Sequence, residues 1–205
     1  MITTKETGED NYVDVNKTAT GEGSILVLGN VNRVLVGAGA RLPKCTIEIR
    51  GNRCVIVIGP NCNINGILRC RADDAVIQIG EGTSMLGATI TLHEAGAIKI
   101  GRDCALSGEI RMDCSDMHSV IDLATKRRIN PPADIVLEDH VLLGFRAQVS
   151  KGTHIGSGTI VSANAAVSGR IPANCLVGGS PASVLREGVT WSRKLLPFDV
   201  DLPVD

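Results

Sequence analysis

The stretch from Leu137 to Val167 reads LEDHVLLGFRAQVSKGTHIGSGTIVSANAAV, and an aliphatic residue recurs in it at every sixth place. These aliphatic positions are Leu137, Leu143, Val149, Ile155, Val161 and Val167. A second column, four places further on, holds only small or slender side chains: Val141, Ala147, Thr153, Thr159 and Ala165. An α-helix, with about 3.6 residues per turn, does not keep sixth neighbours on one face. Simple strand alternation would bury charged residues such as Asp139 and Arg146, so the hexad itself is the structural unit.

Three hexads make one coil of about 18 residues, in which each hexad forms a short strand and a corner. The aliphatic column then points into a narrow prism, and the small column fits the tight corners. The sequence therefore predicts an all-β fold, a parallel β-helix or hexapeptide-repeat solenoid. A longer repeat precedes this stretch, because the pairs Ile58-Gly59, Ile79-Gly80 and Ile100-Gly101 are twenty-one residues apart. We expect the extra residues to lie in bulging corners.

The same pattern divides the chain into three parts. Residues 1–23 show no repeat and are expected to form a mobile arm or a first capping strand. Residues 24–182 form the β-helix domain, which is interrupted at 112–134 by an inserted loop without hexads; ordered loops of this length are more often functional than decorative. Residues 183–205 are expected to hold a short C-terminal helix and a tail, with Ser180 suited to cap this helix and Pro181 to begin it.

The composition excludes several classes of function. The net charge is −1 and the basic residues are spread along the chain, which argues against a nucleic-acid-binding face or a polybasic membrane patch. No apolar run is long enough to span a membrane, and the polar N-terminus does not resemble a signal peptide, so the cytoplasm is the expected location. The seven cysteines are odd in number and include no C-x-x-C pair, which is typical of reduced core residues.

Five motifs carry a resemblance to a known family. They are Asp116-Met117-His118, Arg128-Ile129-Asn130, Val141-x-Leu143-Gly144, Gly178-Gly179-Ser180-Pro181-Ala182 and Trp191-x-Arg193-Lys194. With the hexads, they make residues 24 to 194 resemble the hexapeptide-repeat acyltransferases, and among them the enzymes that O-acetylate capsular polysaccharides or sialic acids. The resemblance implies a left-handed coil, acetyl-CoA as acyl donor and a sugar or polysaccharide hydroxyl as acceptor. It also implies a homotrimer in which each inserted loop helps to close the site of a neighbour.

The resemblance also assigns roles to residues. His118 is the expected general base, oriented by Asp116 or by a backbone carbonyl, and Cys114 is expected to be a bystander because no acyl-enzyme is required. The donor is expected along Gly144, Arg170, Gly178, Gly179, Ser180 and Arg186. The acceptor is expected near Arg127, Arg128 and Leu142. Relatives usually carry Trp at the position of Leu142, so this chain keeps an apolar wall there but lacks the ring and its N–H donor.

Two other functions fit the same fold. One is a γ-type zinc carbonic anhydrase, in which three histidines from adjacent subunits hold the metal. The chain has four histidines, His93, His118, His140 and His154, but it lacks a close pair five residues apart, and no metal is expected. We interpret the three other than His118 as ordinary polar positions. The other function is an inactive scaffold, which the missing tryptophan would allow and the Asp116-Met117-His118 motif argues against. The basic trio Lys126, Arg127 and Arg128 has two interpretations: a solvated face, which is the usual one for a run of charges, and a site that holds an anionic sugar.

Overall fold

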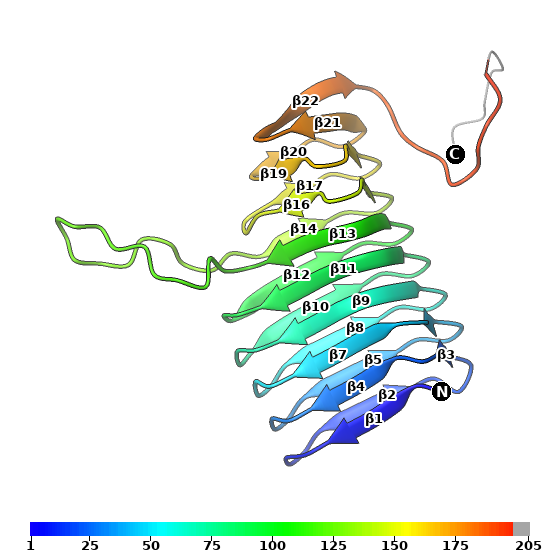
Figure 1. Cartoon of the computed structure of the whole chain (residues 1–205), viewed down its shortest axis with the longest axis vertical. Coiled ribbons are helices and arrows are strands. Elements are labelled where there is room, and N and C mark those ends of the chain that lie inside the picture. The colour runs from blue at the N-terminus through cyan, green and yellow to red at the C-terminus, as the bar shows by residue number, and fades with distance from the viewer. Residues whose placement is uncertain (199–205) are drawn as a thin grey trace.

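The protein is a stack of β-coils, as a computed structural model describes it for residues 1–198 (Figure 1). The described residues form strands, turns and connecting segments, and they contain no helix. None of them therefore forms a helix that is long and apolar enough to cross a membrane. The all-β parallel β-helix that the hexads predict is confirmed.

Two sheets form the walls of the prism. The eight-stranded sheet takes one strand from each coil: β2 (Tyr12–Val15), β5 (Arg33–Val36), β8 (Val55–Ile58), β10 (Ala75–Ile79), β12 (Gly96–Ile100), β14 (Ile135–Leu137), β17 (His154–Ile155) and β20 (Arg170–Ile171). The main path of the fourteen-stranded sheet holds β1 (Thr3–Glu6), β4 (Ser24–Val27), β7 (Cys45–Ile49), β9 (Asn63–Cys70), β11 (Ser84–Leu92), β13 (Ala105–Asp113), β15 (Leu142–Leu143), β18 (Ile160–Val161), β21 (Cys175–Gly179) and β22 (Ala182–Glu187). Beside this path lie β3 (Thr20–Gly21), β6 (Arg41–Leu42), β16 (Gln148–Val149) and β19 (Ala166–Val167).

The core of the prism consists of the two columns found in the sequence. All six aliphatic residues from Leu137 to Val167 are buried, and so are all five members of the small column. In the earlier coils, Ile58, Ile79 and Ile100 stack directly on one another in the parallel ladder from β8 through β10 to β12. All seven cysteines are free and buried, which confirms that they fill the core. Each aliphatic side chain buried in this way contributes about 1.5–3 kcal/mol relative to an exposed one.

The strands of the longer coils contain local register shifts. The register between β9 and β11 shifts between Met85 and Ala88, and that between β11 and β13 shifts between Gly87 and Ala88. The residue left over in β13 is Glu109, whose φ of 59° is in the left-handed region. Each shift is a bulge of one residue between two coils of nearly equal length.

Both ends of the chain differ from the sequence expectation. The solenoid begins earlier, because β1, β2 and β3 pair in parallel with β4, β5 and β6; residues 1–23 therefore contain the first coil, which agrees with the capping strand and not with the mobile arm. The hexads are faint there because no coil covers this end, and the side chains that face the core, such as Val13 and Val15, are only partly buried.

The predicted C-terminal helix is wrong. Residues 182–187 form β22, which pairs antiparallel with β21 in a hairpin at the end of the stack. Gly179, with a φ of 99°, and the cis peptide between Ser180 and Pro181 belong to the turn. A helix here would leave the backbone groups along the last parallel strand without partners, whereas β22 pairs them.

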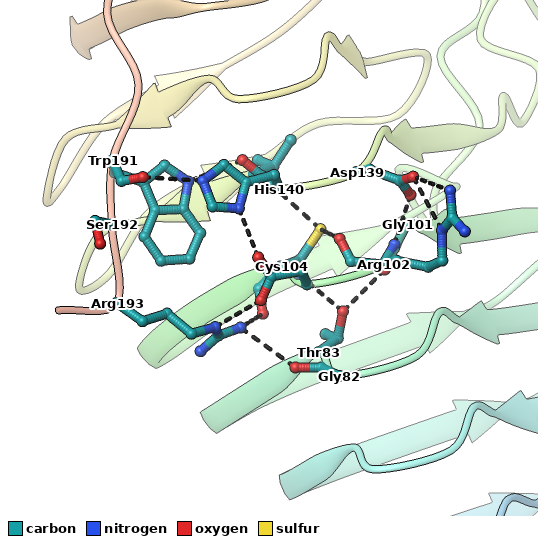
Figure 2. Close-up of polar contacts among 12 residues, drawn as sticks. Gly82, Thr83, Gly101, Arg102, Cys104, Asp139, His140, Trp191, Ser192 and Arg193 are labelled. Carbon is teal, nitrogen blue, oxygen red and sulfur yellow. Dashed lines mark hydrogen bonds and ion pairs between the residues drawn. The ribbon is translucent and has the colours of Figure 1, made fainter. Parts of the chain in front are cut away.

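The segment after β22 returns along the outside of the prism and straps several coils together (Figures 1 and 2). The Trp191 ring stacks on the His140 ring with 4.3 Å between centroids, and its Nε1 donates to the His140 carbonyl oxygen at 2.8 Å. Arg193 donates to Asp103 at 2.6 Å and to the carbonyl oxygens of Gly82 and Cys104. Within the motif from Trp191 to Lys194, Trp191 and Arg193 therefore hold the tail against three successive coils.

We predict that Gly144 is required by the stacking of coils. A Cβ on Gly144 would lie 2.5 Å from the backbone nitrogen of Ala163 in the next coil, and one on Gly156 would lie 2.5 Å from that of Ala173. Gly144→Ala and Gly156→Ala should each lower the free energy of unfolding by about 1–3 kcal/mol in urea denaturation, because neither backbone can give way easily. Gly87→Ala is the control, since its Cβ would be 3.7 Å from the nearest atom. If Gly144→Ala instead keeps the wild-type stability and raises the KM for acetyl-CoA, the stacking prediction is wrong and Gly144 contributes to binding of the donor.

Candidate active site

The inserted loop leaves the solenoid after β13 and returns at β14 as a finger that projects from the stack (Figure 1). Its two arms are joined by an antiparallel bridge between Ile121 and Arg128, and a turn at Asp122 closes the tip. Several apolar side chains of the finger are exposed in the single chain: Met117, Val120, Ile121, Leu123 and Ile129. The finger is thus an ordered structure that carries apolar surface away from the core.

An ion pair anchors the finger to the neighbouring coil. The guanidinium of Arg128 donates to both carboxylate oxygens of Glu94 at 2.6 Å each. The Ser115 hydroxyl donates to the same carboxylate at 2.5 Å. Hydrogen bonds from Arg128 and then Ser115 lower the pKa of Glu94 to about 2. The carboxylate is therefore ionised and fixed under both arms of the loop.

Asn130 is the centre of the loop root and is itself buried. Its Nδ2 donates to the Asp116 carboxylate and to the His118 carbonyl oxygen, each at 2.8 Å. Its Oδ1 accepts from the backbone nitrogen of Val120 at 2.8 Å and from Arg128 at 3.1 Å. A single amide therefore sets the course of the chain through the predicted catalytic segment.

Asp116 and His118 are both exposed. Within residues 1–198, the hydrogen bond between them joins backbone groups and not side chains. The Asp116 carboxylate lies 2.6 Å from Nζ of Lys151, and the hydrogen bonds from Lys151 and then Asn130 lower its pKa. The His118 backbone nitrogen donates to the Asp116 carbonyl oxygen at 2.7 Å. Within residues 1–198 of one chain, the His118 ring has no hydrogen-bond partner, and the Asp116 carboxylate is engaged elsewhere.

A groove runs along the outer face of the fourteen-stranded sheet to the root of the loop. The part next to the loop has a volume of about 420 Å³ and includes Ser115, Asp116 and Lys151 in its wall. It also includes His93, whose Nδ1 lies 2.5 Å from the Asp113 carboxylate. The sequence analysis treated His93 as an ordinary polar position. The only signal in the sequence is that His93 and Asp113 are one coil apart.

The residues expected to hold the donor lie at the last coils. Gly178, Gly179 and Ser180 are at the hairpin between β21 and β22, three strand spacings from β13, or about 14 Å along the axis. Arg186 is exposed on β22 of this sheet, while Arg170 is exposed on β20 of the other sheet. A Cβ on Gly178 would meet the Ser162 hydroxyl at 2.9 Å, so packing alone accounts for this glycine.

The three residues expected near the acceptor lie in different surroundings. Arg128 is bound to Glu94 and Asn130, so its guanidinium anchors the loop. Arg127 is exposed at the tip of the finger. Leu142 is half-buried on β15, stacked between Ala105 and Ile160 on the outer face of the same sheet. Of the three, only Arg128 contacts the loop root.

No family model matches the sequence. A polysialic acid O-acetyltransferase of Neisseria meningitidis is 31% identical over 192 residues, which make up 93% of this chain and 89% of that protein. The chain belongs to the polysialic acid O-acetyltransferase family. Another protein of that name, from Escherichia coli O1:K1, is 26% identical over 136 residues, or 66% of this chain and 44% of that protein.

Solved structures of this polysialic acid O-acetyltransferase family superimpose on nearly the whole chain. OatWY matches with a TM-score of 0.87 at 26% identity, covering 96% of this chain and 93% of that one. NeuO also matches with a TM-score of 0.87, at 24% identity and with 98% and 92% coverage. The protein is therefore an O-acetyltransferase with the parallel β-helix fold of hexapeptide-repeat acetyltransferases, and the family resemblance seen in the sequence is confirmed.

Several site residues of this family member were missed in the sequence because they come from different coils. Glu94, Lys151 and Asp113 lie next to the loop root only after the coils are stacked. Within the described residues, no three His, Cys, Asp or Glu side chains converge to form a metal site. The groove and the loop root are thus made of hydrogen-bonding and charged groups.

We predict that Glu94→Gln releases the finger without unfolding the solenoid. Trypsin should cut after Lys126 and Arg127 roughly tenfold faster in this variant, because the loss of two charge-assisted hydrogen bonds lets the loop open locally more often. The matched control is Glu109→Gln, which removes an ion pair with Arg146 outside the loop and should leave the cleavage rate unchanged.

The pKa of Glu94 fixes how this anchor depends on pH. A carboxyl group whose pKa is lowered on folding adds stability above its ordinary pKa of 4.5, and this contribution is lost as the pH falls through about 2. The finger of the wild type should thus resist protease equally at every pH at which trypsin is active. Equal cleavage of wild type and Glu94→Gln would show that the anchor lies elsewhere.

Proposed function

We propose that the protein transfers an acetyl group from acetyl-CoA to a hydroxyl of an acidic surface polysaccharide, of the polysialic acid type, or of its precursor. The observation that carries the proposal is the 31% identity to a polysialic acid O-acetyltransferase across 93% of the chain, with the inserted loop placed beside an open groove. All seven cysteines are unpaired, which agrees with action in the reducing cytoplasm.

The general base in this proposal is His118. A sugar hydroxyl is a poor nucleophile at neutral pH, and a neutral imidazole is able to accept its proton. The His118 side chain is exposed at the loop, where an acceptor in the groove or in a neighbouring subunit can reach it. As the hydroxyl oxygen attacks the thioester carbonyl, His118 takes the hydroxyl proton, and it returns this proton to the sulfur that leaves.

Asp116 is proposed as a positioning residue. Its carboxylate binds Lys151 and Asn130, and Asn130 also binds the carbonyl oxygen of His118. The pair of Asp116 and Lys151 therefore fixes the backbone that carries the imidazole, although the carboxylate does not contact the ring within one chain. This role differs from a direct contact with the ring, which was one of the two alternatives that the sequence left open.

The donor, acetyl-CoA, supplies the acetyl group as a thioester and needs no covalent intermediate on the chain. Cys114 is the thiol next to the loop, but it is buried and burial raises its pKa to about 11, so it is not a thiolate at neutral pH. We place the donor along the last coils, with Gly179 and Ser180 offering backbone donors and Arg186 a charge for phosphate. The glycines suit a close backbone approach, although Gly178 also has a packing role.

A homotrimer is proposed because the finger is incomplete alone. Leu123 is 79% exposed at its tip, and four further apolar side chains of the finger are exposed with it. Exposed apolar surface of this kind marks a protein–protein contact. In a trimer, each finger would cover the groove of a neighbour and bring its His118 to the acceptor.

We predict that His118→Ala lowers kcat by roughly 10²- to 10⁴-fold, because a general base contributes a factor of this size. The matched control is His93→Ala, which removes the other histidine next to the loop and should lower kcat by less than tenfold. Radiolabelled acetyl transfer to polysialic acid measures both. If His93→Ala abolishes transfer and His118→Ala does not, the base is the histidine bound to Asp113.

Thermal shift separates the proposed function from the two alternatives. Stabilisation by CoA and not by zinc supports the transferase, because a ligand that binds only the folded state raises the Tm. Stabilisation by zinc alone would favour the zinc hydratase, and a shift with neither would favour a scaffold.

We predict that Leu123→Ser weakens self-association at least tenfold, because a buried leucine contributes about 1.5–3 kcal/mol. Sedimentation should show a trimer for the wild type and a concentration-dependent loss of trimer for the variant, with an unchanged far-ultraviolet spectrum. Leu195→Ser, at a fully exposed position of the tail, is the control and should behave like the wild type. A wild type that sediments as a monomer at micromolar concentration would contradict the proposed site.

A further inference from the structure

The groove on the fourteen-stranded sheet has two halves that meet at one row of side chains. The half next to the loop has a volume of about 420 Å³, and the half next to Glu109 and Asn164 has a volume of about 450 Å³. Both are lined by Thr89, Arg111 and Gln148. These three residues are direct neighbours across β11, β13 and β16. The two halves thus form one continuous groove, with Arg111 in the middle row.

The cations at the ends of the groove are already paired. Arg146 binds Glu109 at 2.7 Å and Lys151 binds Asp116 at 2.6 Å. Arg69, which also lines the groove, binds Glu48 at 2.7 Å. Asp113, the third acid of the groove, is bound to His93, and within the described residues none of the three acids pairs with Arg111.

Arg111 differs from these cations. It is exposed between two buried neighbours, Ile110 and Met112, so its side chain points outward from β13. Within residues 1–198, its guanidinium has neither an ion-pair partner nor a hydrogen-bond partner. The residues beside it in the ladder, Thr89 and Gln148, are neutral and carry hydrogen-bonding groups. The centre of the groove therefore presents a free guanidinium flanked by a hydroxyl and an amide.

We propose that Arg111 selects an acidic acceptor by binding a carboxylate of the sugar chain, and this inference rests on the proposed function. A guanidinium binds a planar carboxylate through two parallel hydrogen bonds, which a neutral sugar cannot accept in the same way. The Thr89 hydroxyl and the Gln148 amide can donate further hydrogen bonds to the same two carboxylate oxygens. Because the groove continues from Arg111 to Asp116, a carboxylate held there aligns the polymer with the root of the loop that carries His118.

The acceptor itself provides the first test. With the wild type, polysialic acid whose carboxylates have been reduced to alcohols should show a KM roughly 10- to 100-fold higher than native polysialic acid, because a charged hydrogen-bonded pair is lost. Arg111→Gln should raise the KM for native polysialic acid by a similar factor and should no longer distinguish the two polymers. The kcat at saturating acceptor and the KM for acetyl-CoA should stay within about threefold.

Two further variants separate this role from general effects. Arg102→Gln removes the same charge from an arginine that is paired with Asp139 outside the groove, and it should keep the wild-type KM for both polymers. Arg111→Lys keeps the charge but not the bidentate geometry, and it should give an intermediate KM. If Arg111→Gln still prefers native polysialic acid by the wild-type factor, Arg111 is not the anchor.

Direct binding distinguishes failure of this inference from failure of the proposed function. Calorimetry with native polysialic acid and no donor should show binding to the wild type and at least tenfold weaker binding to Arg111→Gln. If this difference is found but no acetyl transfer occurs, the anchor stands and the proposed reaction is wrong. If transfer occurs and both proteins bind the polymer equally, the reaction stands and the anchor is wrong.

Discussion

Every coil of this protein lies directly on the next at the distance set by backbone hydrogen bonds, about 4.8 Å, and this spacing governs the rest of the structure. The side chains that point inward must fit a narrow prism, so the core is built from Ile, Val, Leu, Ala and Cys. At the corners, the backbone of one coil touches that of the next, and Gly144 and Gly156 leave no room for a Cβ. The sequence repeat follows directly from this contact.

The stacking also explains how a polar site arises on a regular scaffold. Residues far apart in the chain become neighbours when they occupy the same position in adjacent coils. Arg69 and Glu48 meet in this way, and Asp113 reaches His93, which lies two residues beyond its ladder partner Thr91. The inserted loop adds a further set of contacts, because Glu94 and Lys151 from coils on either side bind its root. The loop is therefore ordered at its base by charges, although its tip is apolar and exposed.

The charged groups near the groove of this protein act mainly through short-range pairs. The net charge of −1 gives no general attraction for a polyanion, and most cations near the groove are matched by a carboxylate of the chain. Recognition of an acidic polymer would therefore depend on one guanidinium in a shaped groove, and less on a long-range field. Such a site discriminates by geometry, and its contribution should depend less on salt than that of a polybasic patch.

The amino-acid sequence by itself determined the repeating fold, the place of the inserted loop and the family, because hexads and corner residues are local patterns that a parallel coil requires. It did not determine the first coil or the end of the stack. At these ends, only one neighbour covers each coil, so the hydrophobic column weakens, and Ser180-Pro181 read as the start of a helix although it forms a hairpin turn. Only the tertiary structure decided which groups surround His118 and which arginine is free. Arg128 and Arg111 look alike in the sequence, but stacking places Glu94 against the first and neutral side chains beside the second.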